Sequence, residues 1–340
     1  SRSTTLVSAA QLTAQILATD IAATGSFPVT VLNPAPAGGT SAAATVAVVN
    51  PVPTLTSIVP ASKIAGDAAF VLTVNGTNYN NSSIVRLNGS DRTTTLVNAT
   101  QLTAQITAAD LALAGTPAIT VFNPAPGGGT SAASTLTVNN PVPTLTSIAP
   151  TTKTAGDAAF ILTVNGTNFV NTSVVRLNGS DRTTTLVNAT QLTAQITAAD
   201  VAAAGTPAIT VFNPAPGGGT SSAVSLTVNN PVPTLTSIAP ATKTAGDLAF
   251  VLTVNGTNYN SSSIVRLGGT DRPTTLVNST QLTAQLTAAD VQAAGTFPIT
   301  VFNPAPAGGT SVSANLTVNN LAPTLTSIVP TTKTAGDAAF

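Results

Sequence analysis

The side chains that could carry out chemistry in this chain are few and of few kinds. Its 340 residues include no histidine and no cysteine, and all eleven acidic residues are aspartate. The usual general bases and nucleophile–base pairs therefore cannot be assembled. A serine–lysine pair is conceivable, but Lys63 lies in a turn-rich segment that lacks the pattern typical of a catalytic serine. The sequence predicts a protein that is not an enzyme, with no catalytic and no cofactor-binding residues.

Aspartates are the remaining candidates for a metal site. Asp67, Asp91 and Asp110 could supply oxygen ligands to calcium, but they are scattered and no D-x-D-x-D-G loop is present. We expect them to cap turns and to form ion pairs, Lys63 with Asp67 and Arg86 with Asp91, and we expect no metal site. An isopeptide bond from Lys63 to an asparagine would require a buried lysine beside a carboxylate, so a solvated lysine is favoured.

The motif with the clearest chemical meaning is Asn-X-Ser/Thr, the acceptor sequence for N-glycosylation. The candidate acceptors are Asn75, Asn88, Asn98, Asn165, Asn178, Asn188, Asn255 and Asn278. Further copies of the motif start at Asn80, Asn81, Asn171, Asn260 and Asn315. The alternative is that these asparagines are turn residues next to threonine-rich strands. The sequence leaves both interpretations open.

All of these residues recur because the chain is built from repeats. The stretch PTLTSIAPTTKTAGDAAFILTVNGTNF begins at Pro143, is nearly repeated from Pro53 and from Pro233, and starts again at Pro323, a period of 90 residues. Such a period suits a small independent domain. The predicted domains are a partial one over 1–50, complete ones over 53–140, 143–230 and 233–320, and a partial one over 323–340.

Each complete repeat has the pattern of an all-β sandwich with one short helix. The predicted strands are 53–60, 70–74, 84–87, 93–97, 101–106, one around Ile119 and Val121, and one around Leu136 and Val138. Prolines mark the first as an edge strand, Asn75-Gly76 should end the second, and Asn88-Gly89 is a hairpin turn. Thr107 should cap a helix of one to two turns that Gly115 ends, whereas Leu17 provides a weaker cap in the first copy.

One set of aromatic residues does not follow the strand alternation. Phe122, Phe212 and Phe302 are out of phase with the inward positions of their strands. They could cover a contact between domains or chains, or only the rim of the sandwich.

Composition limits the partners. The formal net charge is zero, and only 6% of the residues are charged. This gives no electrostatic footprint for nucleic acid, and a neutral surface offers little repulsion against self-association. No apolar run has the length of a membrane span. The expected partners are copies of the same chain or neighbouring chains in a filament, with cell-surface or glycan ligands as a second option.

The motifs PTLTSI, AGD, LTVNGTN, VVRLNG, TQLTAQI and GGGTS, taken together, resemble the IPT/TIG family of Ig-like domains. The resemblance covers each full repeat and is similar to the tandem form in large bacterial surface and secreted proteins. It implies early-set Ig-like sandwiches that serve as a spacer or stalk outside the cell. Some members of the family in transcription factors bind DNA, but the basic loops that this needs are not found here.

Three functions follow as hypotheses. The first is a structural array that forms an extracellular filament or cell-surface stalk. The second is a multivalent adhesin or carbohydrate-binding protein whose loops NPAPGGGT and NGTN recognise a ligand. The third is a spacer in a larger secreted enzyme. Since Ser1 aligns with Asp91 and Phe340 with Phe250, we expect the repeats to continue in both directions, rather than one chain completing the next by strand donation.

Overall fold

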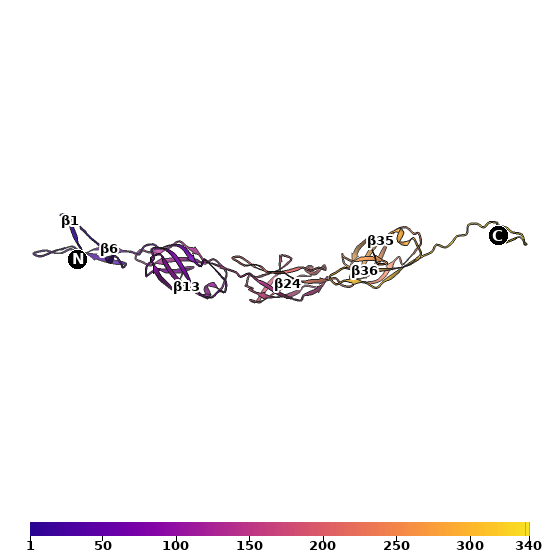
Figure 1. The fold of residues 1–340 in the computed structure, drawn as a ribbon, viewed down its shortest axis with the longest axis horizontal. Helices are drawn as coiled ribbons and strands as arrows, with labels where there is room; N and C mark the ends of the chain where they lie inside the picture. The colour runs from indigo at the N-terminus through magenta and orange to yellow at the C-terminus, as the bar shows by residue number, and fades with distance from the viewer. Residues whose placement is uncertain (337, 340) are drawn as a thin grey trace. The chain divides into compact units, whose positions relative to one another are not determined.

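Three hydrophobic cores, one in each full repeat, define the fold. The structure is a computed structural model that describes residues 1–336, 338 and 339. The cores lie within residues 55–138, 145–228 and 235–318. Figure 1 shows the strands in each of these ranges. Among the described residues, the only helices are short 3-10 turns, and none has the length or hydrophobicity to cross a bilayer.

The first sheet of the repeat that starts at Pro53 is antiparallel throughout. Its strand order is β12 (Thr94–Asn98), β13 (Gln101–Ile106), β9 (Phe70–Thr77) and β7 (Thr54–Val59). Leu72 lies opposite Ala104 and Val74 opposite Leu102, so the alternating apolar residues of β9 and β13 share one face. Strand β7 lies at the edge, as its flanking prolines predict.

The second sheet contains β10 (Ile84–Leu87), β11 (Ser90–Asp91), β14 (Ala118–Asn123), β15 (Gly129–Thr130) and β16 (Ser134–Thr135). A short strand β8 (Ser62–Ile64) pairs in parallel with β17 (Thr137–Asn139). Strands β7 and β8 therefore belong to different sheets, the arrangement of an Ig-like sandwich. The prediction that Lys63 lies among turns was wrong, because it lies in β8 opposite Val138.

The other two full repeats have the same elements. The repeat from Pro143 contains β18 (Thr144–Ala149), β19 (Thr152–Thr154), β20 (Phe160–Thr167), β21 (Val174–Leu177), β22 (Ser180–Asp181), β23 (Thr184–Asn188), β24 (Gln191–Ile196), η3 (Ala198–Val201), β25 (Ala208–Asn213), β26 (Gly219–Thr220), β27 (Val224–Ser225) and β28 (Thr227–Asn229). The repeat from Pro233 contains β29 (Thr234–Ala239), β30 (Thr242–Thr244), β31 (Phe250–Thr257), β32 (Ile264–Leu267), β33 (Thr270–Arg272), β34 (Thr274–Asn278), β35 (Gln281–Leu286), η4 (Ala288–Val291), β36 (Gly295–Asn303), β37 (Gly309–Thr310) and β38 (Ala314–Asn319).

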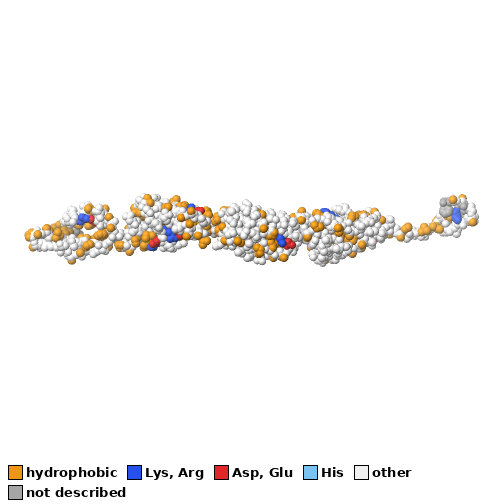
Figure 2. Space-filling view, turned by 90° about the horizontal axis from the view of Figure 1, so that it is seen from below, with side chains coloured by type: hydrophobic (Ala, Val, Ile, Leu, Met, Phe, Trp, Pro, Cys, Tyr) orange, Lys and Arg blue, Asp and Glu red, His pale blue; other side chains and the backbone are white. Residues whose placement is uncertain are grey.

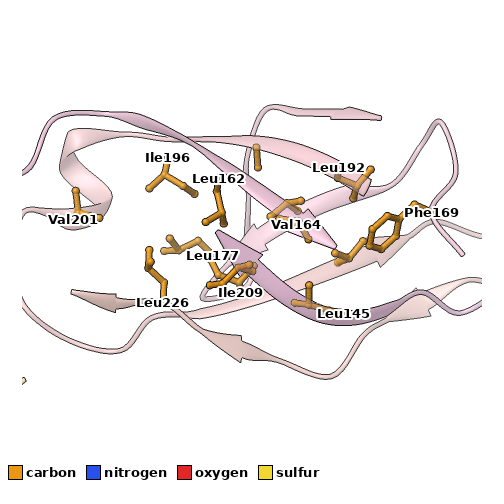
Figure 3. Packing of buried hydrophobic residues seen from close by; sticks show 14 of the residues in the cluster. Leu145, Leu162, Val164, Phe169, Leu177, Leu192, Ile196, Val201, Ile209 and Leu226 are labelled. Atoms are coloured by element: carbon orange, nitrogen blue, oxygen red, sulfur yellow. The ribbon is translucent and has the colours of Figure 1, made fainter. Parts of the chain in front are cut away.

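The core lies between the two sheets and extends along the whole sandwich. In the repeat from Pro143, Ile196 and Val201 occupy one end, Phe169 the other, and Leu162 lies between them (Figure 3). Leu162 and Val164 are completely buried, as the alternation of β20 predicts. Core residues come from both sheets and from the helical turn, so each sandwich is closed by its own side chains.

Asn75-Gly76 does not end its strand, contrary to the prediction. Strand β9 continues to Thr77, and Asn75 still pairs with Gln101. A Cβ atom on Gly76 would lie 2.0 Å from the carbonyl oxygen of Thr54 and 2.3 Å from the hydroxyl of Tyr79. The glycine therefore allows a close approach of β7 and a packed aromatic ring, and it is not a strand breaker.

The predicted helix is shorter and tighter than expected. It is a single 3-10 turn, η2 (Ala108–Leu111), in which the hydroxyl of Thr107 accepts a bond from the backbone N–H of Asp110. The N-cap prediction is confirmed. The C-terminal prediction was wrong, because Gly115 lies beyond the turn and bridges Val138 of β17. The turn ends where Leu111 has entered the core.

The segments on either side of the three sandwiches have no such core. Residues 1–50 form β1 (Thr4–Ser8) with β2 (Gln11–Ala14), β3 (Gly25–Val29) with β6 (Ala44–Val48), β4 (Leu32–Asn33) with β5 (Gly39–Thr40), and a 3-10 turn η1 (Ala18–Asp20). The described residues after Asn319 form no strand, although N-terminal strands were expected over 323–340. Asp337 and Phe340 of that range lie outside the described residues.

Candidate functional site

The loop NPAPGGGT, which follows β14, is the most unusual piece of backbone in the repeat. We call residues 123–129, and their equivalents 213–219 and 303–309, the junction loop. The Ala125–Pro126 bond is cis, and Gly127 and Gly128 have φ angles of 69° and 70°. A Cβ atom on Gly128 would lie 2.2 Å from the carbonyl oxygen of Asn123, so this position requires glycine. In the last full repeat, Ala307 replaces the first of these two glycines, with φ 49°.

The junction loop that follows β14 binds Asn50. This residue comes just before the proline-rich start of the same repeat. The backbone N–H of Asn50 donates to the Pro126 carbonyl at 2.8 Å, and its carbonyl accepts from Gly128 N–H at 2.6 Å. Its side-chain Nδ2 donates to the Pro124 carbonyl at 2.6 Å, and its Oδ1 accepts from Asn80 at 2.9 Å. Asn50 is buried, and these bonds satisfy both its backbone and its carboxamide.

Hydrogen bonds from the same repeat also hold the two residues that follow Asn50. Asn123, which is completely buried, donates from Nδ2 to the Pro51 carbonyl at 2.9 Å and accepts from the Ser83 hydroxyl at 2.6 Å. Asn78, in the NGTN turn, donates from Nδ2 to the Val52 carbonyl at 2.8 Å. Three consecutive carbonyls, from residues 50 to 52, thus have defined donors within the repeat that follows them.

The backbone and Nδ2 bonds of Asn50 recur at the other two junctions. The Oδ1 of Asn230 accepts from Asn260 at 2.9 Å, whereas Val170 takes the place of this donor in the middle repeat. Asn140 donates from its backbone to Pro216 at 2.7 Å and from Nδ2 to Pro214 at 2.8 Å. Asn230 makes the equivalent bonds to Pro306 and Pro304, at 2.8 and 2.7 Å. We call Asn50, Asn140 and Asn230 the linker asparagines.

The residue directly before the linker asparagine is also hydrogen-bonded. Asn139 belongs to β17, and its carbonyl accepts from the backbone N–H of Ala65 at 2.8 Å. Asn140, one peptide bond later, is bonded to the junction loop at Pro214 and Pro216. The chain therefore leaves a strand and enters the next loop without an intervening free residue.

These contacts change the interpretation of the two loops proposed to recognise a ligand. The inner carbonyls of NPAPGGGT bind the linker asparagine, and the last asparagine of NGTN binds the linker carbonyl. The sequence patterns did not predict that the connector Asn-Asn-Pro-Val-Pro contacts these loops. The available signal was the second asparagine of each connector, which recurs at the repeat period together with the loop.

The charged side chains are paired within each repeat, as predicted for two of the pairs. Lys63 lies 3.0 Å from Asp67, and Arg86 lies 2.6 Å from Asp91. In Figure 2 the blue and red side chains form small groups on a surface that is otherwise uncharged. Lys63 also lies 5.2 Å from the ring centre of Phe70, so its recorded partners are a carboxylate and an aromatic ring. Within the described residues, no group of three potential metal ligands exists.

The third pair, between Arg92 and Asp110, was not predicted and is the most buried. Arg92 donates from Nε and from one terminal nitrogen to the two Asp110 oxygens, at 3.1 and 2.7 Å. Burial acts to raise the pKa of Asp110, but hydrogen bonds from Thr107 and Arg92 outweigh it and hold the pKa below its ordinary value. The pair ties the start of β12 to the helical turn.

The out-of-phase aromatics lie on the outer face of the second sheet. The Arg86 guanidinium is centred 3.8 Å from the Phe122 ring, and Arg266 stands at the same distance from Phe302. Phe122 is half-buried. A guanidinium at this distance stacks on the ring and shields it from water, so in these repeats the aromatic residue packs against its own arginine.

The predicted glycosylation asparagines fall into three settings. Asn75, Asn165 and Asn255 lie within strands, and Asn88 and Asn178 lie in hairpin turns with positive φ. Asn98, Asn188 and Asn278 lie at exposed ends of strands β12, β23 and β34. A polar hollow on the first full repeat is lined by residues that include Asn81, Ser83, Asp91, Thr93 and Pro124.

Comparison with known proteins gives one family. The family model described as IPT/TIG domain matches residues 53–138, 143–228 and 233–318. None of the curated protein sequences compared with the chain matches it.

Several solved structures are similar to the chain at low identity. A crystal structure with a xylogluco-oligosaccharide is 19% identical, with 77% of this chain and 59% of that chain covered and a TM-score of 0.35. The D1–D4 ectodomain fragment of ICAM-5 is 17% identical, with coverage of 83% and 80% and a TM-score of 0.36. A Ca2+-stabilized adhesin of an Antarctic bacterium is 19% identical, with coverage of 93% and 87% and a TM-score of 0.24. The chain also spans only 34% of the Plexin A4 extracellular region that it matches.

Proposed function

Because the chain belongs to the IPT/TIG domain family, we propose that it is a non-enzymatic structural protein, whose tandem Ig-like domains form an extracellular filament or a cell-surface stalk. Its domains in this proposal are 53–140, 143–230 and 233–320, with partial ones over 1–50 and 323–340. Copies of the same chain or neighbouring chains are its partners in the filament.

The observation that carries the proposal is the linker asparagine in its junction loop. A stalk needs connections that do not swing freely, and a free linker would act as a flexible tether. Here Asn140 is bonded on its backbone and on its side chain to Pro216 and Pro214, directly after a residue of β17. A protein that served only as a flexible tether for a distant domain would not need these hydrogen bonds.

Surface composition supports the same proposal. Cations and anions are equal in number, at eleven each, and those of each repeat pair with one another. Little charge remains to oppose the packing of one chain against another. A multivalent adhesin remains the second candidate, supported by the polar hollow at Asn81 and Asp91.

Distance measurement between neighbouring repeats tests the proposal. The chain has no cysteine, so Thr95→Cys and Thr185→Cys, both at exposed positions, place two spin labels selectively. The expected result is a narrow distance distribution. Asn140→Asp should broaden it, because the carboxylate cannot donate to the Pro214 carbonyl and places a charge beside it. Asn139→Ala, one residue earlier, is the matched control and should leave it narrow.

A broad distribution in the unsubstituted linker would contradict the proposal. The junction loop offers a second comparison: Gly218→Ala should broaden the distribution, since its Cβ atom would lie 2.2 Å from the Asn213 carbonyl oxygen. Gly217→Ala should have less effect, because Ala307 already occupies the equivalent position. Electron microscopy of the native material should show fibres or surface projections, and isolated compact particles would exclude the filament.

A further inference from the structure

The sequons differ in whether their asparagine side chain is free to accept a sugar. In N-glycosylation the carboxamide nitrogen Nδ2 becomes bonded to the anomeric carbon of the sugar. A folded repeat can carry the glycan only where Nδ2 faces solvent and makes no bond that the fold needs. The hydroxyl two residues later must also be accessible to the transferase. These conditions separate the settings of the sequons.

The strand asparagines fail the first condition. Asn75 donates from Nδ2 to the Ser57 hydroxyl at 3.1 Å and accepts at Oδ1 from Gln101 at 3.0 Å. Asn165 and Asn255 repeat both bonds, to Ser147 and Gln191 and to Ser237 and Gln281. These bonds join β7, β9 and β13 across their faces. A glycan on Nδ2 would have to displace the β7 serine.

The sequons between β9 and β10 fail as well. Asn80 donates from Nδ2 to the linker asparagine Asn50, so its nitrogen is already used. Asn81 is exposed, but the hydroxyl that its sequon requires belongs to Ser83, which is buried and donates to Asn123. The folded repeat cannot present that hydroxyl to an enzyme.

The hairpin between β12 and β13 meets every condition. Asn98 is exposed at the end of β12, and its Oδ1 accepts from both the N–H and the hydroxyl of Thr100, at 2.9 and 2.8 Å. Asn188 with Thr190, and Asn278 with Thr280, make the same two bonds at the same distances. All the recorded side-chain bonds of these asparagines are made by the oxygen. The turn therefore presents the nitrogen and the threonine hydroxyl together at the surface.

The turn itself does not require this motif. In residues 1–50 the equivalent position is Ser8, whose hydroxyl accepts from the Ala10 N–H at 3.3 Å, and the sequence Ser-Ala-Ala there is not a sequon. Asn88 and Asn178 are also exposed, and their Oδ1 atoms accept from the backbone N–H of Ala118 and Ala208, so they meet the same conditions. Gly268 replaces them in the last full repeat, which therefore has no sequon at this position. Only the β12–β13 position has an accessible sequon in all three full repeats.

We propose that Asn98, Asn188 and Asn278 carry N-linked glycans, one on the same hairpin of each full repeat, and that Asn75, Asn165 and Asn255 stay unmodified. The sugar comes from a lipid-linked sugar (pyro)phosphate through a cellular transferase. The bond from the anomeric carbon to the phosphate oxygen breaks and a carbon–nitrogen bond to Nδ2 forms. The proton lost from Nδ2 ends on the phosphate leaving group, and nothing is oxidised or reduced.

Peptide mapping of protein purified from its native source tests the proposal. Peptides that contain Asn98–Thr100, Asn188–Thr190 and Asn278–Thr280 should carry added masses in steps of a hexose or an N-acetylhexosamine, and peptides that contain Asn75–Thr77, Asn165–Thr167 and Asn255–Thr257 should have the unmodified mass. Unmodified peptides at the three hairpins, or glycans on the strand asparagines, would overturn the proposal.

Variants of the full chain, secreted from a glycosylating host, test the same assignment. Asn98→Ser, Asn188→Ser and Asn278→Ser copy the residue at Ser8, so the turn should keep its hydrogen bond. Each should remove one glycan from the intact mass without changing the melting temperature. Thr77→Ala destroys the Asn75 sequon and should leave the mass of the glycans unchanged. An intact glycan mass in Asn98→Ser would overturn the assignment.

Discussion

Residues 1–50 and residues 91–140 have similar sequences and very different surroundings. Ile16 is 52% exposed, whereas Ile106, at the equivalent position, is completely buried. Val31 and Val121 differ in the same way, at 45% and 0%. The segment 91–140 packs against β9 and β10 of its own repeat, and residues 1–50 contain no such strands.

The local structure of the two segments is nevertheless the same. Strand β1 pairs with β2 in the register Thr4 to Ala14, and β12 pairs with β13 in the register Thr94 to Ala104, each with an irregularity at the same place. The hairpin therefore follows from nearby residues, while burial requires the strands that come earlier in the repeat. Alternation indicates which side chains can be buried, and packing against the earlier strands of the repeat decides whether they are.

The largest expected effect comes from a matched pair of isoleucine substitutions, one in a core and one outside it. Ile106→Ala should lower the free energy of unfolding of its repeat by about 2–5 kcal/mol, because burial is lost and a cavity remains. Ile16→Ala should leave every unfolding transition unchanged. Denaturant unfolding of a protein of residues 1–340 measures both. A loss of stability from Ile16→Ala would mean that residues 1–50 possess a core.

The ion pair to the helical turn gives a smaller effect that depends on pH. Hydrogen bonds from Thr107 and Arg92 outweigh burial and lower the pKa of Asp110, so the pair stabilises the repeat above the ordinary pKa of an aspartate. This contribution is lost as the pH falls from about 4 through the lower pKa of the folded state. Arg92→Ala should cost roughly 1 kcal/mol at neutral pH and flatten the acid side of the stability curve.

Arg2 and Asp20 provide the comparison for that experiment. The hydrogen bond from Arg2, together with the backbone N–H of Leu17, lowers the pKa of Asp20 to about 2. Because this pair joins two exposed parts of residues 1–50, Arg2→Ala should move the Asp20 pKa towards its ordinary value without altering any melting temperature. Carboxyl chemical shifts in an NMR titration measure the pKa. A change in melting temperature would contradict the comparison.

The smallest effect should come from the helix cap. Thr107→Leu copies Leu17 and removes the bond between the threonine hydroxyl and Asp110 N–H, which is long at 3.3 Å, so we expect a loss of about 0.5–1 kcal/mol. The reverse change, Leu17→Thr, should have no effect on stability. Thermal unfolding of both variants, followed at two protein concentrations, gives the result. A gain in stability from Leu17→Thr equal to the loss from Thr107→Leu would show that the cap acts without the core.

Sequence patterns predicted most of the sandwich, and their failures have a common cause. The inward faces of Leu102, Ala104 and Ile106 and the edge position of β7 follow from period-two alternation and from proline chemistry. The role of Gly76 did not, because the space that it leaves is filled by Thr54 and Tyr79 from other parts of the fold.

The candidate site was harder to predict for the same reason. The partner of Asn50 at Pro124 lies 74 residues along the chain, so no local pattern reports the contact. The sequence identifies the sequons as one set, and the hydrogen bonds of their asparagines distinguish Asn75 from Asn98 only after the strands have been assembled. Local sequence identifies such residues, and their partners are decided by tertiary contacts.

The parallel pairing of β8 with β17 has a mechanical consequence. Strand β8 is near the start of the repeat and β17 is at its end, and the two are held by a ladder over Ser62–Ile64 and Thr137–Asn139. A pulling force applied to the two ends of a repeat acts along these strands in opposite directions, so it shears the whole ladder at once and does not open it bond by bond. The resistance of a repeat to stretching should therefore depend on this short ladder, which sets the rate of forced unfolding.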